Sequence, residues 1–298
     1  MSLQLNQKVK SEQAGFTLVE LIVALAIGLI VSAAALQLFT GGLITAKLQE
    51  ASAELQDSGV FGVEYVARDI RLANFGNTNN PILNGTTQQG GIVFTSGETG
   101  NVNLKLKGVD ANLLTKSGGT ADTNLKSDQL TIQFRAPNKM VNCEGKEVKT
   151  GEYVIQRYFL SGSTGGLALT CDANNTGSND VSIAGLSATD KGVVIMPRVD
   201  LLRFYIGAKV GNNFSYYTID QFNTSTNSPR AISIRMMVLV RSKDPITSKN
   251  IDPSKETFEF PDGTVKPTDT KTQYLRRLYT TNIALRNGLG EKVYESSN

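Results

Sequence analysis

One long apolar run near the start of the chain constrains its fold more than any other feature. The run extends from Leu21 to Phe39, and none of its residues is charged. About 20 apolar residues cross the hydrocarbon core of a membrane as a helix, which rises 1.5 Å per residue. The run is therefore long enough to span a membrane, and a folded domain has to be built from the residues that follow it.

The charges on either side of the run predict its orientation and a role for one acid. Lys8 and Lys10 precede it, so the positive-inside tendency keeps the N-terminus cytoplasmic and sends the rest of the chain across the membrane. Glu20 stands at the start of the run, where a carboxylate is costly unless it pairs or serves a function. We therefore expect Glu20 to take part in assembly within a membrane.

The segment Ala14-Gly15-Phe16-Thr17-Leu18-Val19-Glu20 resembles the processing site of type IV prepilins. The resemblance implies that a prepilin peptidase cuts between Gly15 and Phe16 on the cytoplasmic side and that the new terminal Phe16 is N-methylated. The mature amine then lies four residues before Glu20, on the same helix face. In a bundle of such helices, the Glu20 carboxylate of one subunit can pair with the amine of its neighbour, which makes Glu20 the expected assembly contact.

Two simpler interpretations of the same segment exist. An ordinary secretory signal peptide would be cut near 33–35, although Glu20 would then interrupt its apolar region. A plain membrane anchor would keep its leader. Sequencing the N-terminus separates the three, because the prepilin begins at Phe16, the secreted form near Leu36 and the uncut anchor at Met1.

Three further segments are similar to the minor-pilin subgroup called PilW: 67–73, 232–241 and 275–287. The resemblance implies an α+β pilin fold, in which a long N-terminal helix packs on an antiparallel β-sheet domain with long loops. The predicted division is a leader at 1–15, the helix at 16–72 with its transmembrane part at about 16–40, and a globular periplasmic or extracellular domain at 73–298.

Apolar periodicity supports this division. Leu48, Leu55, Val63, Val66 and Ile70 recur at helical spacing, which predicts an amphipathic second half of the helix that docks on a sheet. Alternation and apolar runs predict strands at 130–135, 153–160, 193–196, 202–208, 214–219, 232–240 and 279–285. Segments rich in Asn, Gly, Ser and Thr predict exposed loops at 96–100, 116–126, 172–180 and 223–228.

The two cysteines, Cys143 and Cys171, both lie in the translocated portion. In an oxidising compartment they most simply form one disulfide, which would stabilise the fold by about 3 kcal/mol. Two unpaired thiols are the alternative.

Most chemical signals in the sequence are weak. The segment 172–177 resembles the first half of a calcium loop, but Ile183 stands where the bidentate acid belongs, so a plain turn is the better interpretation. The chain has no histidine, no Cys-x-x-Cys motif and no Walker phosphate loop. No spacing sets two acids apart as a catalytic pair. We therefore expect no metal site, no cofactor and no enzymatic activity.

The basic end of the chain leaves contact with nucleic acid open. Arg276 and Arg277, near Tyr274 and Tyr279, could touch DNA through phosphates and stacking. The net charge of +3 gives no general argument for such a partner, and a solvated strand face is the preferred interpretation.

The resemblance implies a minor pilin, and the size of the domain after the helix also favours a minor over a major subunit. Such a protein primes pilus assembly in the inner membrane, then sits at or near the pilus tip on the cell surface and supports twitching motility, adhesion and DNA uptake. Its implied partners are other minor pilins, the major pilin, the prepilin peptidase, the assembly platform and a tip adhesin. The alternatives are a pseudopilin of a type II secretion system and a pilus-borne module that binds DNA or another ligand.

Overall fold

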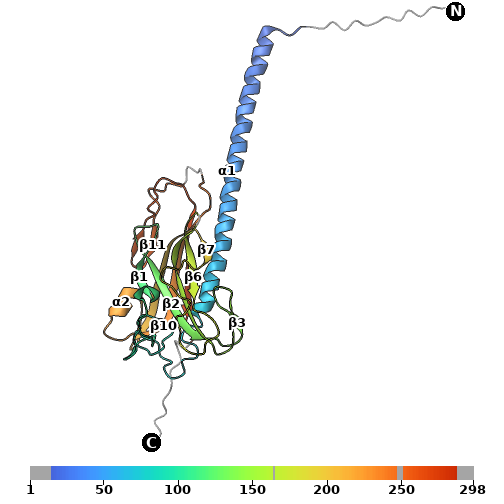
Figure 1. Cartoon of the computed structure of the whole chain (residues 1–298). Coiled ribbons are helices and arrows are strands. Elements are labelled where there is room, and N and C mark those ends of the chain that lie inside the picture. Colours follow the sequence, from blue (N-terminus) through green and yellow to red (C-terminus); the bar gives the residue numbers. More distant parts are fainter. Residues whose placement is uncertain (1–14, 164, 247–250, 287–298) are drawn as a thin grey trace, which may run out of the picture. The chain divides into compact units, whose positions relative to one another are not determined.

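The computed structural model describes residues 15–163, 165–246 and 251–286 (Figure 1). Apart from Gly15, the predicted leader lies outside the described residues, as does residue 287 of the last PilW-like segment. The chain divides into two compact units, Met1–Lys47 and Leu48–Asn298, and helix α1 (Leu18–Ile70) contributes to both.

The first part of α1, up to Lys47, exposes nearly all of its apolar side chains. Leu21, Ile22, Leu25, Leu29 and Phe39 are all exposed, and the helix is long and apolar enough to cross a membrane. Burying such side chains in water-free surroundings is favourable. This part of the helix therefore suits lipid or the helices of other subunits.

The second unit is built around two antiparallel sheets. The first has the order β1 (Lys116–Gly119), β2 (Ser127–Arg135), β5 (Tyr153–Ser163), β6 (Gly166–Ala173) and β7 (Val193–Pro197). The second has the order β13 (Arg276–Ala284), β10 (Arg230–Arg241), β8 (Val199–Val210) and β9 (Asn213–Thr218). The smaller elements are η1 (Ala111–Leu113), the pair β3 (Met140–Val141) and β4 (Glu147–Val148), α2 (Ile219–Thr224), and the pair β11 (Phe258–Phe260) and β12 (Gly263–Val265).

Period-two alternation along the strands builds one main core between the two sheets. It contains alternate residues of β2, β8 and β10: Leu130, Ile132, Phe134; Leu202, Phe204, Ile206; Ile234, Met236, Val238 and Val240. The intervening positions of β8 and β10 face outward, where Leu201, Tyr205, Met237 and Leu239 pack against Phe260 and Val265 of the β11–β12 hairpin. Successive side chains of a strand point to opposite faces, so both sides of this sheet are partly covered.

The second half of α1 is seated against an edge strand of each sheet. A Cβ atom added to Gly59 would overlap the ring of Tyr279 on β13, and one added to Gly62 would overlap Met196 on β7. The Tyr279 hydroxyl donates to the carbonyl of Leu55 at 2.7 Å, and Arg198 pairs with Glu54 at 2.6 Å. Two small residues on one helix face thus let the helix approach both sheets closely.

The structure confirms the predicted class of fold, and it corrects the predicted loops. All of the predicted strands are present with shifted ends. The predicted loop at 116–126 begins with β1, and the predicted loop at 172–180 begins inside β6, with Asp172, Ala173 and Asn174 buried. The predicted loop at 223–228 begins in the last turn of α2. Burial on both faces removes the alternation that would have identified β6.

The close packing of α1 at Gly59 predicts that Gly59→Ala destabilises the domain. Overpacking against the Tyr279 ring costs about 1–3 kcal/mol, which outweighs the gain of up to about 1 kcal/mol in helix propensity. Gly41→Ala is the matched control, because a Cβ there meets nothing within 4 Å. Denaturant unfolding of the full chain in detergent measures both. A Gly59→Ala domain as stable as the parent would contradict the proposed seat.

Candidate functional site

The start of α1 is a capping box that involves Glu20. The Thr17 hydroxyl oxygen accepts a hydrogen bond from the backbone N–H of Glu20 at 3.3 Å, and the Glu20 carboxylate accepts one from the backbone N–H of Thr17 at 3.0 Å. The Thr17 hydroxyl also donates to that carboxylate at 3.0 Å. Such reciprocal bonds satisfy backbone donors that a helix start leaves without partners. The sequence analysis singled out Glu20 but missed Thr17, although the Thr-x-x-Glu spacing signals a capping box.

Gly15 and Phe16 precede the helix. Both are exposed and have no regular secondary structure. A peptidase has to bind an accessible, extended chain, and the Gly15–Phe16 bond meets that condition. The predicted cleavage, N-methylation and assembly roles of Gly15, Phe16 and Glu20 remain predictions.

The second unit carries an open groove beside the second half of α1. The groove has a volume of about 650 Å³, and its walls are one face of α1, strand β7 and the loop that starts at Cys143. It is lined by Asp57, Ser58, Phe61, Gly62, Tyr65, 143–145, 193–195 and Pro197. Phe61 is 74% exposed and Val194 is 46% exposed. Large apolar side chains that lie together on a surface mark an interaction site more often than single ones do.

The β7 wall of the groove is also a sheet edge. Strand β7 pairs with β6 on one side, and no described strand pairs with its other side. An edge strand presents backbone groups that another chain can pair with. The groove therefore combines apolar contact area with free hydrogen-bonding capacity.

A disulfide holds the third wall of the groove. Cys143 and Cys171 form a disulfide, as predicted. Their Cα atoms lie 6.1 Å apart, and the two residues are separated by 28 positions in the sequence. The Tyr65 hydroxyl donates to the Cys143 carbonyl at 3.4 Å, and the Glu144 carboxylate accepts from the backbone N–H of Ala173 at 3.4 Å. The loop is thus fixed to α1 and to β6 at once.

A buried polar network ties the end of α1 to the same loop. The Tyr158 hydroxyl donates to the Asp69 carboxylate at 2.8 Å. With its amide nitrogen toward Asp69, Gln156 donates to that carboxylate at 3.2 Å and accepts from the Cys143 N–H at 2.8 Å. Burial raises the pKa of the Asp69 carboxyl, and burial together with Asp69 raises the pKa of the Tyr158 hydroxyl. Asp69 and Tyr158 are both closed to solvent, so the role of this network is structural. Its hydrogen bonds hold the groove wall in position.

Arg276 is not available to contact DNA, and it does not lie on the solvated strand face that the sequence analysis preferred. Its side chain is 1% exposed, and its guanidinium pairs with Asp200 at 2.8 Å and with Glu256 at 2.7 Å. Both acids are distant in sequence, so the sequence alone gave no sign of them. Arg277 is exposed on the other side of β13, and its predicted contact stays a prediction.

Asp172 also has a buried ion-pair partner, which corrects the calcium-loop resemblance. It is buried and pairs with Arg157 at 2.8 Å, so it is not a free calcium ligand. Within the described residues, no three acidic or cysteine side chains come together as a metal site.

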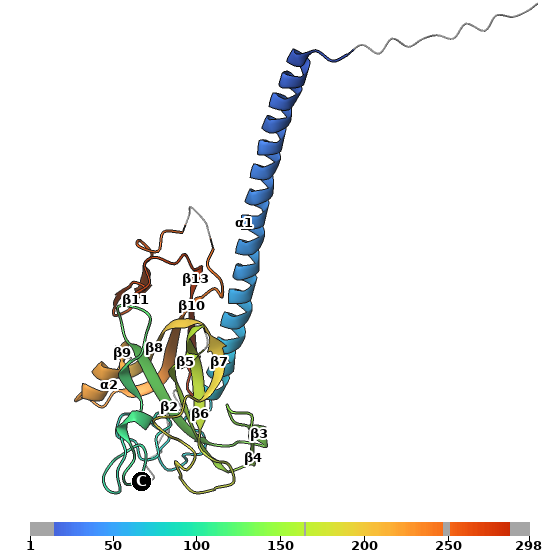
Figure 2. The same cartoon turned by 45° about the horizontal axis from the view of Figure 1, so that its top comes forward.

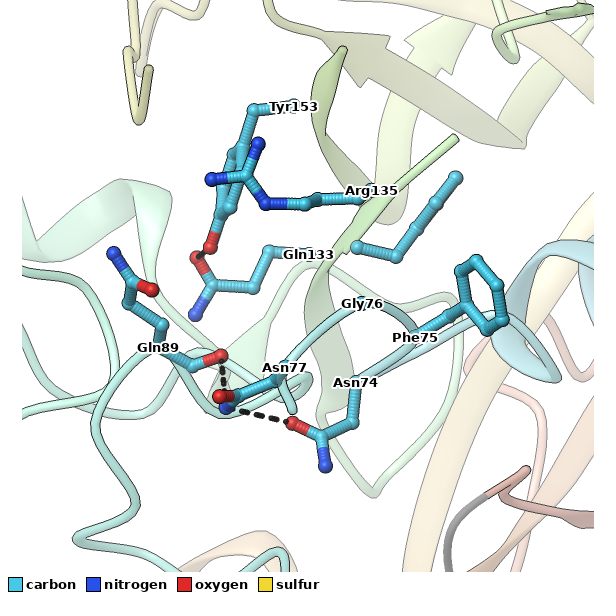
Figure 3. Close-up of a pocket in the computed structure, with 9 residues that line it drawn as sticks. Asn74, Phe75, Gly76, Asn77, Gln89, Gln133, Arg135 and Tyr153 are labelled. Atoms are coloured by element: carbon cyan, nitrogen blue, oxygen red, sulfur yellow. Dashed lines mark hydrogen bonds between the residues drawn. The ribbon is translucent and has the colours of Figure 1, made fainter. Parts of the chain in front are cut away.

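A small cavity lies where the chain leaves α1 (Figure 3). Its volume is about 10 Å³, and polar side chains line it. The Tyr153 hydroxyl donates to Gln133 at 2.7 Å, and Asn77 donates to Asn74 at 3.2 Å. A cavity of this size holds about one water molecule, so it is too small for an organic ligand.

Comparisons with known proteins agree with the resemblance at the methylation site and at segments 232–241 and 275–287, whereas segment 67–73 lies outside both matches. The family model described as "Type IV Pilus-assembly protein W" (PilW) matches residues 157–287, which run from β5 to just beyond β13. The model described as "Prokaryotic N-terminal methylation motif" matches residues 10–36. No curated protein sequence matches the chain.

A similar solved structure is the type IV-like pilin TTHA1219 from Thermus thermophilus. It is 12% identical, with a TM-score of 0.38, and the match covers 78% of this chain and 96% of that one.

The methylation motif and the apolar helix that it heads make the chain type IV pilin-like. The chain is also PilW-like over residues 157–287, where the PilW model matches most of its two sheets.

The disulfide predicts a measurable loss of stability on reduction. Replacing both Cys143 and Cys171 by Ser lowers the free energy of unfolding by about 3 kcal/mol, because the unfolded chain regains loop entropy. Denaturant unfolding measures the loss, and the reduced parent protein should lose a similar amount. A parent protein that unfolds identically with and without reductant would contradict the prediction.

Proposed function

We propose that this chain is a minor subunit of a type IV pilus that primes assembly in the inner membrane together with other minor pilins. The observation that carries the proposal is the division of α1. Its second half is seated in the domain, whereas its first part exposes a continuous apolar surface that starts at Glu20. The proposal includes a single-pass anchor with its domain in the periplasm and, later, a place at or near the pilus tip, and this arrangement and the PilW-like sequence support it.

The capping box suggests how Glu20 serves assembly. In the free subunit, the carboxylate bonds to Thr17 of its own helix start. In a helix bundle, the cationic Phe16 amine of a neighbour replaces the Thr17 hydroxyl as its partner. The carboxylate is charged in both bonds, but only the amine brings an opposite charge, so the exchange adds an ion-pair attraction and favours the assembled state.

The groove beside α1 supplies the contact between domains in this proposal. Its apolar wall at Phe61 and Val194 and its free β7 edge suit a neighbouring minor pilin. The pilin class is structural, and we assign no chemical reaction to the chain. Its contributions to twitching motility, adhesion and DNA uptake are indirect in this account, because they depend on the assembled pilus.

The assembly role of Glu20 predicts a separation between processing and incorporation. Glu20→Ala leaves cleavage after Gly15 intact but lowers the amount of the chain in sheared pili, because the neighbouring amine loses its partner. Thr17→Val is the matched control: it removes the two hydrogen bonds of the Thr17 hydroxyl, at about 0.5–2 kcal/mol of helix stability, and keeps the carboxylate. N-terminal sequencing and immunoblots of sheared pili give the two readouts. Equal incorporation of Glu20→Ala would remove the proposed role.

Deletion of the gene separates a pilus from a type II secretion machine, which uses subunits with the same leader and helix. The proposal expects loss of surface pili with protein secretion unchanged. Loss of secretion with normal pili would assign the chain to the secretion machine.

A further inference from the structure

The outer face of the four-stranded sheet is covered along only part of its length. The β11–β12 hairpin covers the part at Leu201, Tyr205 and Met237. The adjoining part consists of side chains from three cross-strand rows: Phe214, Lys209, Arg230; Tyr216, Gly207, Ser233, Ala284; and Thr218, Arg235, Asn282, a row that also includes the covered Tyr205. These rows contain three cations and no carboxylate. Strand β9 lies on the side of the domain away from α1, so this surface is separate from the groove (Figure 2).

Two aromatic rings form a platform over Gly207. A Cβ at this position would lie 3.0 Å from the ring of Phe214 and 3.0 Å from the ring of Tyr216. The two rings meet edge to face, with their centroids 5.2 Å apart. Phe214 is 48% exposed, which leaves ring surface open to solvent. The missing side chain at Gly207 thus brings two rings together on a solvent-facing sheet.

Arg235 completes the platform with a fixed guanidinium. Its Cζ lies 3.9 Å from the centroid of the Tyr216 ring, and its Nε donates to the Asn282 side-chain oxygen at 2.8 Å. The Tyr216 hydroxyl donates to the same oxygen at 3.1 Å. One amide therefore orients both the ring and the cation, while no bond from the two terminal guanidinium nitrogens occurs within the described part of the chain.

Three other arginines of this sheet have a different environment. Arg203 pairs with Asp128 and Asp262, whereas Arg241 and Arg276 share Asp200. Each of these three arginines thus has a carboxylate partner. Arg235 and Lys209 have no ion pair among the described residues. A preorganised guanidinium with free donors is suited to an anionic group, above all to phosphate.

We propose that Phe214, Tyr216 and Arg235 form a binding platform for single-stranded nucleic acid. An exposed ring accepts a base by stacking, and the adjacent guanidinium and Lys209 hold the phosphates on either side. A single strand is favoured over a duplex because stacking on Phe214 requires an unpaired base face. No carboxylate belongs to the three rows, and Asp262, which accepts a hydrogen bond from the Tyr205 hydroxyl, is paired with Arg203.

The platform is tested with the full chain in detergent and a fluorescently labelled single-stranded oligonucleotide, by anisotropy across a salt series. Phe214→Leu keeps an apolar side chain but removes the stacking face, and it should weaken binding by about fivefold to a hundredfold. Arg235→Gln should weaken binding and reduce the slope of log affinity against log salt by about 0.7, the value for one phosphate contact on a single strand.

Lys243→Gln is the matched control, because it removes the same charge from an exposed position directly after β10, outside the platform. Its affinity should stay within about twofold of the parent. Thermal unfolding of each variant shows whether the domain remains folded. Tyr216→Phe retains the ring and should retain binding.

Three results would overturn the proposal: no salt-dependent binding of the oligonucleotide by the parent chain, equal loss in Lys243→Gln and Arg235→Gln, or tighter binding of the matching duplex. Binding of an acidic oligosaccharide that the oligonucleotide does not displace would also overturn it, in favour of a glycan site.

Discussion

The close seat of α1 against two sheet edges is the contact on which the rest of this structure depends. Gly59 and Gly62 let Tyr279 and Met196 reach the helix backbone, so one helix packs against an edge strand of each sheet. Interiors are packed to near-crystalline density, and a contact of this kind tolerates little added volume. The same helix must then leave its first part bare for lipid or for other subunits. The helix meets both requirements because its amino-acid composition changes along its length.

Two buried connections transmit the position of the helix to the groove. The Asp69–Tyr158–Gln156 network reaches the backbone of Cys143, and the disulfide continues to β6. Buried polar groups with complete hydrogen bonding specify one arrangement, because every alternative leaves some of them unsatisfied. The groove wall is therefore set by the same contacts that anchor α1. Docking of a neighbour and integrity of the domain are expected to depend on one another.

The sequence allowed the helix, the strands of the main core and the disulfide to be predicted, because each has a local signature. Apolar length predicted the membrane part of α1, and alternation predicted β10 from residues such as Ile234, Met236 and Val238. Strand β6 was missed because it is buried on both faces. The ion pair of Arg276 was missed because Asp200 and Glu256 are far away in sequence. The groove and the platform at Phe214 depend on tertiary contacts across several strands, which no local pattern records.

We propose that the apolar groove beside the second half of α1 is a contact between pilin subunits in the assembled pilus. The most direct test is cysteine cross-linking in sheared pili with Phe61→Cys, where the native cysteines are already bonded to each other. We expect Phe61→Cys to form a cross-link between this chain and another pilin subunit. Asn213→Cys, on the far strand β9, should form none. Absence of the chain from sheared pili, or cross-links that form equally from both positions, would contradict the proposal.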